Sequence, residues 1–229
     1  MKYEVIIFDA DETLFDFKKS EKYAFENAML EFGMKYDENH HLPIYHSINK
    51  AIWGEFDTGL ITQEELKAER FRRFSKELKL DFDEVAFAAT YARHLSDASY
   101  LYDNITELIA SLHETYRLII VTNGLSSVQE NRIKKSVISG YFEDIIVSEE
   151  VGLSKPDPRI FELALSNIRY TDKSKVLIVG DSLITDIQGG TNSGIDTCWY
   201  NPKRKENATG ILPTYEIESF SQLADILEK

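Results

Sequence analysis

The sequence predicts an α/β protein: a doubly wound, parallel, Rossmann-like sheet with an inserted four-helix cap. Short apolar runs rich in β-branched residues alternate with amphipathic helical segments along much of the chain. Strands that alternate with helices typically form a parallel sheet covered by helices on both faces. Roughly 100 residues with helical periodicity separate the first two strands, far too many for a loop in a compact domain, which indicates an inserted helical unit.

The predicted strands are five short apolar runs, and they cover residues 3–8, 117–121, 144–147, 175–179 and 196–199. Three of these runs end at polar residues. Asp9 and Thr122 directly follow two of them, and Asp181 follows the third after Gly180. In parallel sheets of this kind, ligands bind beyond the carboxyl ends of the strands. We therefore expect these three residues to share one rim of the sheet.

Helix starts between the later strands are marked by capping residues. Ser127 and Glu130 form a predicted capping box, in which the side chain of each residue accepts a hydrogen bond from the main-chain amide of the other. Asp157 is a predicted N-cap in front of Pro158, which suits the first helical position. Residues 219–227 are expected to form the last amphipathic helix.

The inserted segment carries four predicted helices. Thr62 and Glu65 form a second predicted capping box, which marks the start of the third helix. The predicted apolar faces are, in chain order, Phe25, Ala28, Met29 and Phe32; Ile44, Ile48, Ala51 and Ile52; Leu66, Phe74 and Leu78; and Val85, Ala88 and Ala89.

The expected domains follow from this insertion. The core would consist of residues 1–15 and 100–229, and the cap of residues 16–99. The chain crosses between the two domains twice, so hinges are expected near residues 14–17 and 98–104, as in enzymes whose lids open and close.

Charge limits the class of partner. The formal net charge is −13 at pH 7, from 26 Lys and Arg against 39 Asp and Glu. Nucleic acids and anionic membrane surfaces are bound by clustered Lys and Arg, so we expect neither a nucleic-acid polymer nor a membrane as partner. A small molecule is the expected partner. The composition is compatible with a monomer and leaves the oligomeric state open.

Cysteine content and hydropathy indicate a cytoplasmic protein. Cys198 is the single cysteine, which excludes an internal disulfide framework, and we expect it to be a small buried residue. No apolar stretch approaches the ~20 residues that a membrane span needs. The start of the chain is predicted to be a strand and not a signal peptide.

Acidic side chains gather at two of the strand ends. Asp9 and Asp11 follow the first strand, and Asp181 and Asp186 follow another. One such pair alone is more often a solvated loop or a helix cap. Close carboxylates repel each other and raise each other's pKa unless a cation lies between them. Four acids at two parallel strand ends therefore indicate a site for a hard cation, with Mg²⁺ favoured if the ligand carries phosphate.

Three further residues offer groups that bind phosphate oxygens. Thr122 and Asn123 supply a hydroxyl and an amide at a strand end, and Lys155 supplies an ammonium group from a loop. Each has an ordinary alternative, as a turn residue or as an exposed loop lysine. Together they provide the hydroxyl donor and the cation that a phosphoryl group requires.

The order of these residues matches a known family. Nearly the whole chain, including the helical insertion, resembles the haloacid dehalogenase-like hydrolases with a first-type helical cap. The four motifs of that family correspond to Asp9-Ala10-Asp11-Glu12-Thr13, Thr122, Lys155-Pro156, and Gly180-Asp181-Ser182 with Asp186.

This resemblance implies roles for the matched residues. Asp9 would be the nucleophile that forms an aspartyl-phosphate, and Asp11 would be the general acid and then the general base. Thr122, Asn123 and Lys155 would bind the phosphoryl group. Mg²⁺ would be held by Asp9, by the main-chain carbonyl of Asp11 and by Asp181, while Asp186 would orient neighbouring groups.

Departures from the motifs separate the branches of the family. The acidic residue Asp11 argues against the dehalogenase branch, whose members lack an acidic residue at that position. Neither Lys50 nor Lys67 matches the cap lysine of the phosphonate hydrolases. The expected function is therefore Mg²⁺-dependent hydrolysis of small phosphomonoesters. A sugar-phosphate phosphatase or a phosphomutase is the alternative, and a non-catalytic binding protein is a more remote one.

The cap sequence favours one substrate class. Residues 9–17, with Trp53 and Phe56, are similar to the nucleoside 5′-monophosphatase branch, which often acts on pyrimidine nucleotides. Bases stack on aromatic side chains for ~1–3 kcal/mol each. The alternative is that both aromatics pack inside the cap. Arg70 could contact a substrate anion, although an arginine on the surface of a helix is the commoner case.

Overall fold

The computed structural model describes residues 2–228 and divides the chain into two compact units. The core unit consists of Met1–Phe17 and Ser99–Lys229, and the helical unit consists of Lys18–Ala98. That these units act as a catalytic core and a cap stays a prediction.

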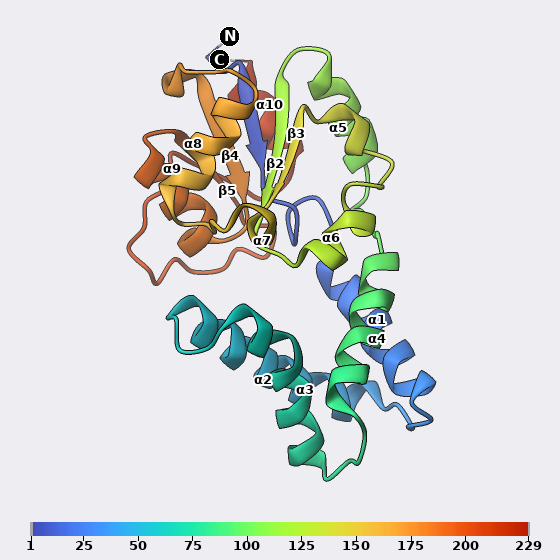
Figure 1. Cartoon of the computed structure of the whole chain (residues 1–229). Helices are drawn as coiled ribbons and strands as arrows, with labels where there is room; N and C mark the ends of the chain where they lie inside the picture. The colour runs from blue at the N-terminus through green and yellow to red at the C-terminus, as the bar shows by residue number, and fades with distance from the viewer. Residues whose placement is uncertain (1, 229) are drawn as a thin grey trace. The chain divides into compact units, whose positions relative to one another are not determined.

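The core unit is built on one six-stranded sheet (Figure 1). The strands are β1 (Val5–Phe8), β2 (Arg117–Thr122), β3 (Asp144–Val147), β4 (Val176–Gly180), β5 (Asp196–Tyr200) and β6 (Tyr215–Ile217). Their order in the sheet is β3-β2-β1-β4-β5-β6, and every pair is parallel. This confirms the predicted doubly wound parallel sheet. The short edge strand β6 was not predicted.

Both faces of the sheet are buried, as expected when helices cover each side. Side chains of β1 alternate between the two faces: Ile6 and Phe8 join one apolar cluster, and Val5 and Ile7 join the other. The first cluster includes residues of α5 (Ile105–His113) and α10 (Ser221–Leu227), and the second includes residues of α8 (Pro158–Asn167). The central strand is therefore fixed from both sides.

Short helical segments complete the core unit. They are α6 (Ser126–Arg132), α7 (Ser148–Val151), α9 (Gln188–Ser193), 3-10 turns at Ser139–Tyr141 and Lys173–Lys175, and a π-helical turn at Leu183–Ile187. Asp157 caps α8 by accepting from the amide of Arg159, with Pro158 in the first turn, which confirms that prediction.

The predicted capping box of Ser127 and Glu130 was wrong. The N-cap residue of α6 is Leu125, whose side chain makes no capping hydrogen bond. The amide of Ser126 instead donates to Glu149 of α7 at 2.6 Å. An acid from a neighbouring helix thus satisfies a first-turn donor, and the helix begins before the predicted box.

The helical unit contains α1 (Phe17–Glu31, whose first residue belongs to the core unit), α2 (Glu38–Asp57), α3 (Gln63–Leu78) and α4 (Glu84–Asp97). The capping box of Thr62 and Glu65 opens α3 as predicted. Its core is strongly aromatic, with Phe25 stacked on Tyr45 at 4.5 Å between ring centroids. The predicted face of α4 was wrong at Val85, which is 69% exposed, and at Ala89, which is also exposed, because the larger rings of Phe87 and Tyr91 occupy the core. The predicted face of α2 was wrong at Ala51, which is exposed, whereas Tyr45 and Ile52 of that helix are buried.

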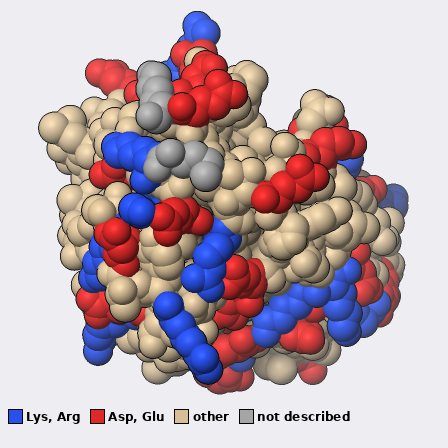
Figure 2. Space-filling model, turned by 90° about the horizontal axis from the view of Figure 1, so that it is seen from above, with Lys and Arg blue, Asp and Glu red and all other residues tan. Residues whose placement is uncertain are grey.

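Charged side chains of both signs are mixed on one face of the protein (Figure 2). Figure 2 shows acidic and basic side chains interspersed on the face seen from above, so the excess of acids is not gathered into one patch on that face. Within residues 2–228, no helix is long and apolar enough to span a membrane.

Candidate active site

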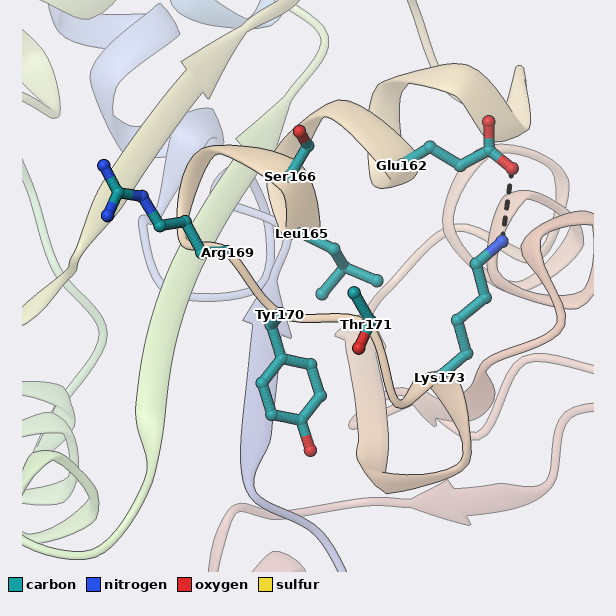
Figure 3. Close-up of a pocket in the computed structure, with 7 residues that line it drawn as sticks. All are labelled: Glu162, Leu165, Ser166, Arg169, Tyr170, Thr171 and Lys173. Atoms are coloured by element: carbon teal, nitrogen blue, oxygen red, sulfur yellow. Dashed lines mark hydrogen bonds and ion pairs between the residues drawn. The ribbon is translucent and has the colours of Figure 1, made fainter.

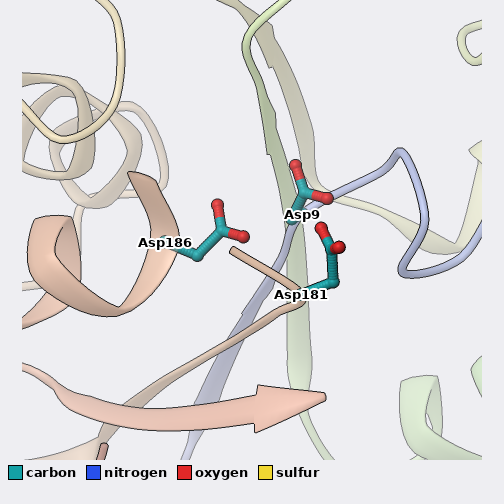
Figure 4. A group of neighbouring side chains, drawn as sticks. All are labelled: Asp9, Asp181 and Asp186. Atoms are coloured by element: carbon teal, nitrogen blue, oxygen red, sulfur yellow. The ribbon is translucent and has the colours of Figure 1, made fainter. Parts of the chain in front are cut away.

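Three acidic side chains meet at the carboxyl ends of adjacent strands. Asp9 directly follows β1 and Asp181 directly follows β4, while Asp186 lies in the π-helical turn after β4. One carboxylate oxygen from each residue lies within 4.8 Å of the other two, and Figure 4 shows the three side chains pointing toward one another. Asp9 and Asp186 are buried, and Asp181 is half-buried. We call these three residues the acidic triad.

Local packing brings Asp186 into the triad. The main-chain amide of Ser182 donates to its Oδ2 at 3.0 Å, and the hydroxyl of Thr185 donates to its Oδ1 at 3.3 Å. Gly180 is required at the end of β4, because a Cβ atom there would overlap the Asp186 carboxylate. A side chain at this glycine would force the acid out of the site.

Lys155 is the cation that joins the triad. Its Nζ lies 2.6 Å from Asp9 Oδ1 and 2.7 Å from Asp186 Oδ1, and the side chain is buried. Burial alone would lower the pKa of Lys155, but the Asp186 and Asp9 carboxylates outweigh burial and raise it. The ammonium group is therefore charged throughout the physiological range.

Lys155 does not neutralise all of the negative charge of the acidic triad. Burial raises the pKa of Asp9 well above its usual range, Lys155 lowers it, and Asp186 and Asp181 raise it again. Burial and the neighbouring Asp186 raise the pKa of Asp181 to about 7. Three carboxylates thus share one buried ammonium group, that of Lys155, while the exposed Lys205 reaches only Asp181. This charge imbalance and the all-oxygen donor set fit a hard divalent cation such as Mg²⁺.

Three other side chains contact the residues of the acidic triad. The Thr13 hydroxyl donates to Asp9 Oδ2 at 3.1 Å. The indole N–H of Trp199 donates to the main-chain carbonyl of Asp181 at 2.9 Å. Lys205 Nζ lies 3.9 Å from Asp181 Oδ2. Trp199 and Lys205 were not predicted as site residues, because neither belongs to a motif.

Thr122 and Asn123 lie at the carboxyl end of β2, the neighbour of β1. Thr122 is buried. The Asn123 side chain is occupied by the main chain of Lys155, with which it makes two hydrogen bonds. Its amide group therefore supports the lysine.

Asp11 is not a member of the acidic triad. Its half-buried carboxylate forms an ion pair with the fully buried Arg132 and accepts a hydrogen bond from Gln129 Nε2 at 3.2 Å. Both partners come from α6, more than a hundred residues along the chain. Neither partner was predicted, because no local sequence pattern links them to Asp11.

The predicted aromatic pair belongs to the helical unit. Trp53 and Phe56 lie on α2, are half-buried, and meet edge to face with 5.8 Å between ring centroids. Arg70 was expected on the surface, and this was wrong: it is 5% exposed and donates to Asn49 Oδ1 at 3.2 Å. Its guanidinium group lies over the rings of Phe71 and Tyr91, which accounts for its burial.

A separate groove of about 540 Å³ lies at the other end of the sheet (Figure 3). It is formed where α8 ends and the chain turns toward the start of β4, and Lys173 pairs with Glu162 across it at 3.2 Å. Asp181 follows the opposite end of β4. The groove is therefore distinct from the triad.

The protein belongs to the haloacid dehalogenase-like hydrolase family, whose model matches residues 6–200. It is 36% identical to the pyrimidine 5′-nucleotidase PynA of Streptococcus pneumoniae, over 100% of this chain and 97% of that protein. It is 31% identical to the pyrimidine 5′-nucleotidase YjjG of Escherichia coli, with 100% of both chains covered. Among solved structures, the HAD-hydrolase YfnB of Bacillus subtilis bound to magnesium matches with a TM-score of 0.93 and 34% identity, over 100% of both chains.

Proposed function

We propose that this protein is a Mg²⁺-dependent phosphatase of small phosphomonoesters, and of nucleoside 5′-monophosphates in particular. The observation that carries the proposal is Lys155 buried between Asp9 and Asp186, with Asp181 completing the acidic triad. A charged lysine beside an otherwise uncompensated group of carboxylates suits an anionic substrate that arrives with a metal ion. The full-length similarity to two pyrimidine 5′-nucleotidases supports the substrate class.

Asp9 is the proposed nucleophile. One carboxylate oxygen attacks phosphorus in line with the ester bond, the bond from phosphorus to the leaving oxygen breaks, and an aspartyl-phosphate forms. Lys155 stabilises the charge that develops on the phosphoryl oxygens. The hydroxyl of Thr122, at the adjacent strand end, is the proposed neutral donor to the same oxygens.

Asp11 is the proposed proton carrier. As general acid it gives a proton to the leaving oxygen, so that a nucleoside departs as a neutral alcohol. Water then attacks phosphorus, the bond to Asp9 breaks, and Asp11 accepts the proton from that water. The side chain is thereby returned to its starting protonation state.

The carboxylates of Asp9 and Asp181 and the main-chain carbonyl of Asp11 are the proposed Mg²⁺ ligands. When bound, the ion supplies Lewis acidity toward a phosphoryl oxygen and offsets the repulsion between Asp9 and the substrate. Trp199 fixes the main chain of Asp181 through its indole hydrogen bond. Asp186 orients Lys155.

The overall acidity of the chain limits the size of the substrate. A net charge of −13 repels a polyanion over its whole length, whereas one small phosphate ester is attracted locally by Lys155 and the metal. We therefore expect single nucleotides to be substrates and nucleic-acid strands not to be.

Phosphate release from a panel of nucleoside monophosphates, sugar phosphates and an aryl phosphate tests this proposal. Nucleotides should be hydrolysed fastest, EDTA should abolish turnover, and Asp9→Asn should be inactive. Asp172→Asn is the matched control, because Asp172 is an exposed helix cap in the same unit. Turnover by Asp9→Asn, or in EDTA, would contradict the mechanism. Faster hydrolysis of hexose phosphates would replace nucleotides as the substrate class.

A further inference from the structure

Arg132 is a fully buried cation for which the proposed chemistry has no role so far. Its guanidinium group pairs with Asp11 Oδ1 through Nη2. Gln129 lies one turn earlier on α6 and donates through Nε2 to Asp11 Oδ2 at 3.2 Å, while its Oε1 accepts from Arg132 Nε at 3.2 Å. Each oxygen of the Asp11 carboxylate is therefore bonded to a donor from the same helix.

This arrangement is built with close packing. Gln129 presses against Gly124 so tightly that a Cβ atom on that glycine would lie 2.6 Å from Nε2. Arg132 Nη1 has no hydrogen-bond partner among the described residues, so the guanidinium group retains one buried donor. A buried arginine with an unused donor is costly if it serves folding alone, because well-packed apolar residues often stabilise such positions equally well.

Arg132 also contacts both places where the chain passes between the two units. Its guanidinium carbon lies 5.4 Å from the ring centre of Phe15 and 5.5 Å from that of Phe17, in the segment that leaves the core unit. Its main-chain carbonyl accepts a hydrogen bond at 2.6 Å from the hydroxyl of Ser99, the first residue of the returning segment. Arg132 is thus in contact with the outgoing segment through its side chain and with the returning segment through its main chain.

We propose that Arg132, assisted by Gln129, is a positioning residue that holds Asp11 as an oriented carboxylate for the hydrolysis of the aspartyl-phosphate. This inference rests on the proposed function, in which Asp11 accepts a proton from the attacking water. An aspartate on a turn can take several side-chain rotamers, and two donors on two different oxygens select one. A carboxylate has about four lone-pair sites, so these two bonds leave places for the water.

The step is balanced in atoms and charge. The water oxygen bonds to phosphorus, the bond from phosphorus to Asp9 breaks, and Asp9 leaves as a carboxylate. The water proton passes to Asp11, which then carries it to the next leaving group. Arg132 and Gln129 take part in no bond that forms or breaks and act only through Asp11.

The test is Arg132→Lys, which keeps the charge but cannot reproduce the planar donor arrangement of the guanidinium group. A loss confined to the second step lowers kcat and KM together. With p-nitrophenyl phosphate, whose leaving group departs without a proton from Asp11, we expect kcat to fall about tenfold, which is a part of the roughly 10²–10⁴-fold that general base catalysis contributes. We expect kcat/KM for this substrate to stay within about twofold of the wild type. With p-nitrophenyl phosphate, the first turnover should release a burst of nitrophenol that approaches the enzyme concentration, followed by slow turnover.

Arg117→Lys is the matched control. Arg117 makes a similar two-bond ion pair, with Glu143 at 2.7 and 2.6 Å, but lies at the opposite end of β2, so its variant should keep the wild-type kcat. Equal losses in kcat and kcat/KM without a burst, or an unchanged kcat, would overturn the role of Arg132. If Arg132→Lys does not fold, Gln129→Leu is judged by the same criteria. Wild-type protein that hydrolyses no phosphomonoester would instead contradict the proposed function.

Discussion

The side-chain amide of Asn123 makes two hydrogen bonds with the main chain of Lys155. Its Nδ2 donates to the Lys155 carbonyl at 2.9 Å, and its Oδ1 accepts from the Lys155 amide at 2.9 Å. This pair joins the end of β2 to the loop before α8, across 32 positions of sequence. The lysine carries its ammonium group at the end of a flexible side chain, so its placement between Asp9 and Asp186 depends on this fixed main chain.

Asn123→Ala should therefore weaken catalysis without removing a group that touches the reaction. We expect kcat/KM to fall about 10–100-fold, because the buried main-chain groups of Lys155 lose their partners and the ammonium group is displaced. Steady-state kinetics with a nucleoside monophosphate measures the loss. Asn167→Ala is the control, since Asn167 donates to Asp144 at an exposed position of the same unit. Full activity in Asn123→Ala would show that the lysine is held by other contacts.

The central strands and the edge where they end were predictable, because they depend on short sequence patterns that recur along the chain. Buried β-branched runs form parallel strands, and parallel strands carry their carboxyl ends to one edge, so Asp9, Thr122 and Asp181 could be grouped in advance. The helix starts at Thr62 and Asp157 were predictable for the same reason, since each cap uses a partner within a few residues.

Contacts over long sequence distances could not be predicted. The pairing of Asp11 with Arg132 spans 121 positions, and an arginine carries no pattern that names its partner. The same limit explains the failed cap at Ser127, where Glu149 from another helix supplied the acceptor. Burial of Arg70 depends on which aromatic rings surround it, and helical periodicity alone does not reveal them.

Metal affinity should depend on pH through Asp181. Its pKa is raised to about 7, so the side chain is increasingly protonated below that pH, and a cation must displace the proton before it binds. The apparent affinity for Mg²⁺ should therefore fall as pH decreases from 8 to 6, by at most about tenfold per pH unit. Mg²⁺ activation curves at pH 6, 7 and 8 provide the measurement. An affinity that stays constant over this range would rule out Asp181 as a titrating ligand.

The same raised pKa predicts that the metal-free protein becomes more stable when Asp181 is neutralised. Because the pKa of Asp181 is higher in the folded state than in the unfolded state, the free energy of unfolding declines as pH rises from about 4 to about 7. It stays at the lower value above about pH 7. Asp181→Asn removes this penalty, so in EDTA at pH 8 we expect a gain of about 1–2 kcal/mol in the free energy of unfolding, and several degrees in Tm.

Thermal unfolding at pH 5 and pH 8 checks the sign of this effect. The difference in Tm between Asp181→Asn and the wild type should be larger at pH 8 than at pH 5, because the wild-type side chain is already protonated at pH 5. Asp172→Asn should give no such gain, since the pKa of Asp172 is lowered by its hydrogen bonds with Ser174. A Tm that falls in Asp181→Asn at both pH values would contradict the charge imbalance of the acidic triad.

Trp53 tests whether the helical unit contributes to the choice of substrate. If its ring stacks on a nucleobase, Trp53→Ala loses ~1–2 kcal/mol, and KM for nucleoside monophosphates should rise about 5–30-fold. Ribose 5-phosphate has no base, so its kinetics should change little. Tyr23→Ala is the control, because Tyr23 is an exposed aromatic residue on α1 of the same unit. Equal changes for both substrates, with a lower Tm, would instead mean that Trp53 serves only to pack against Phe56, its edge-to-face neighbour on α2.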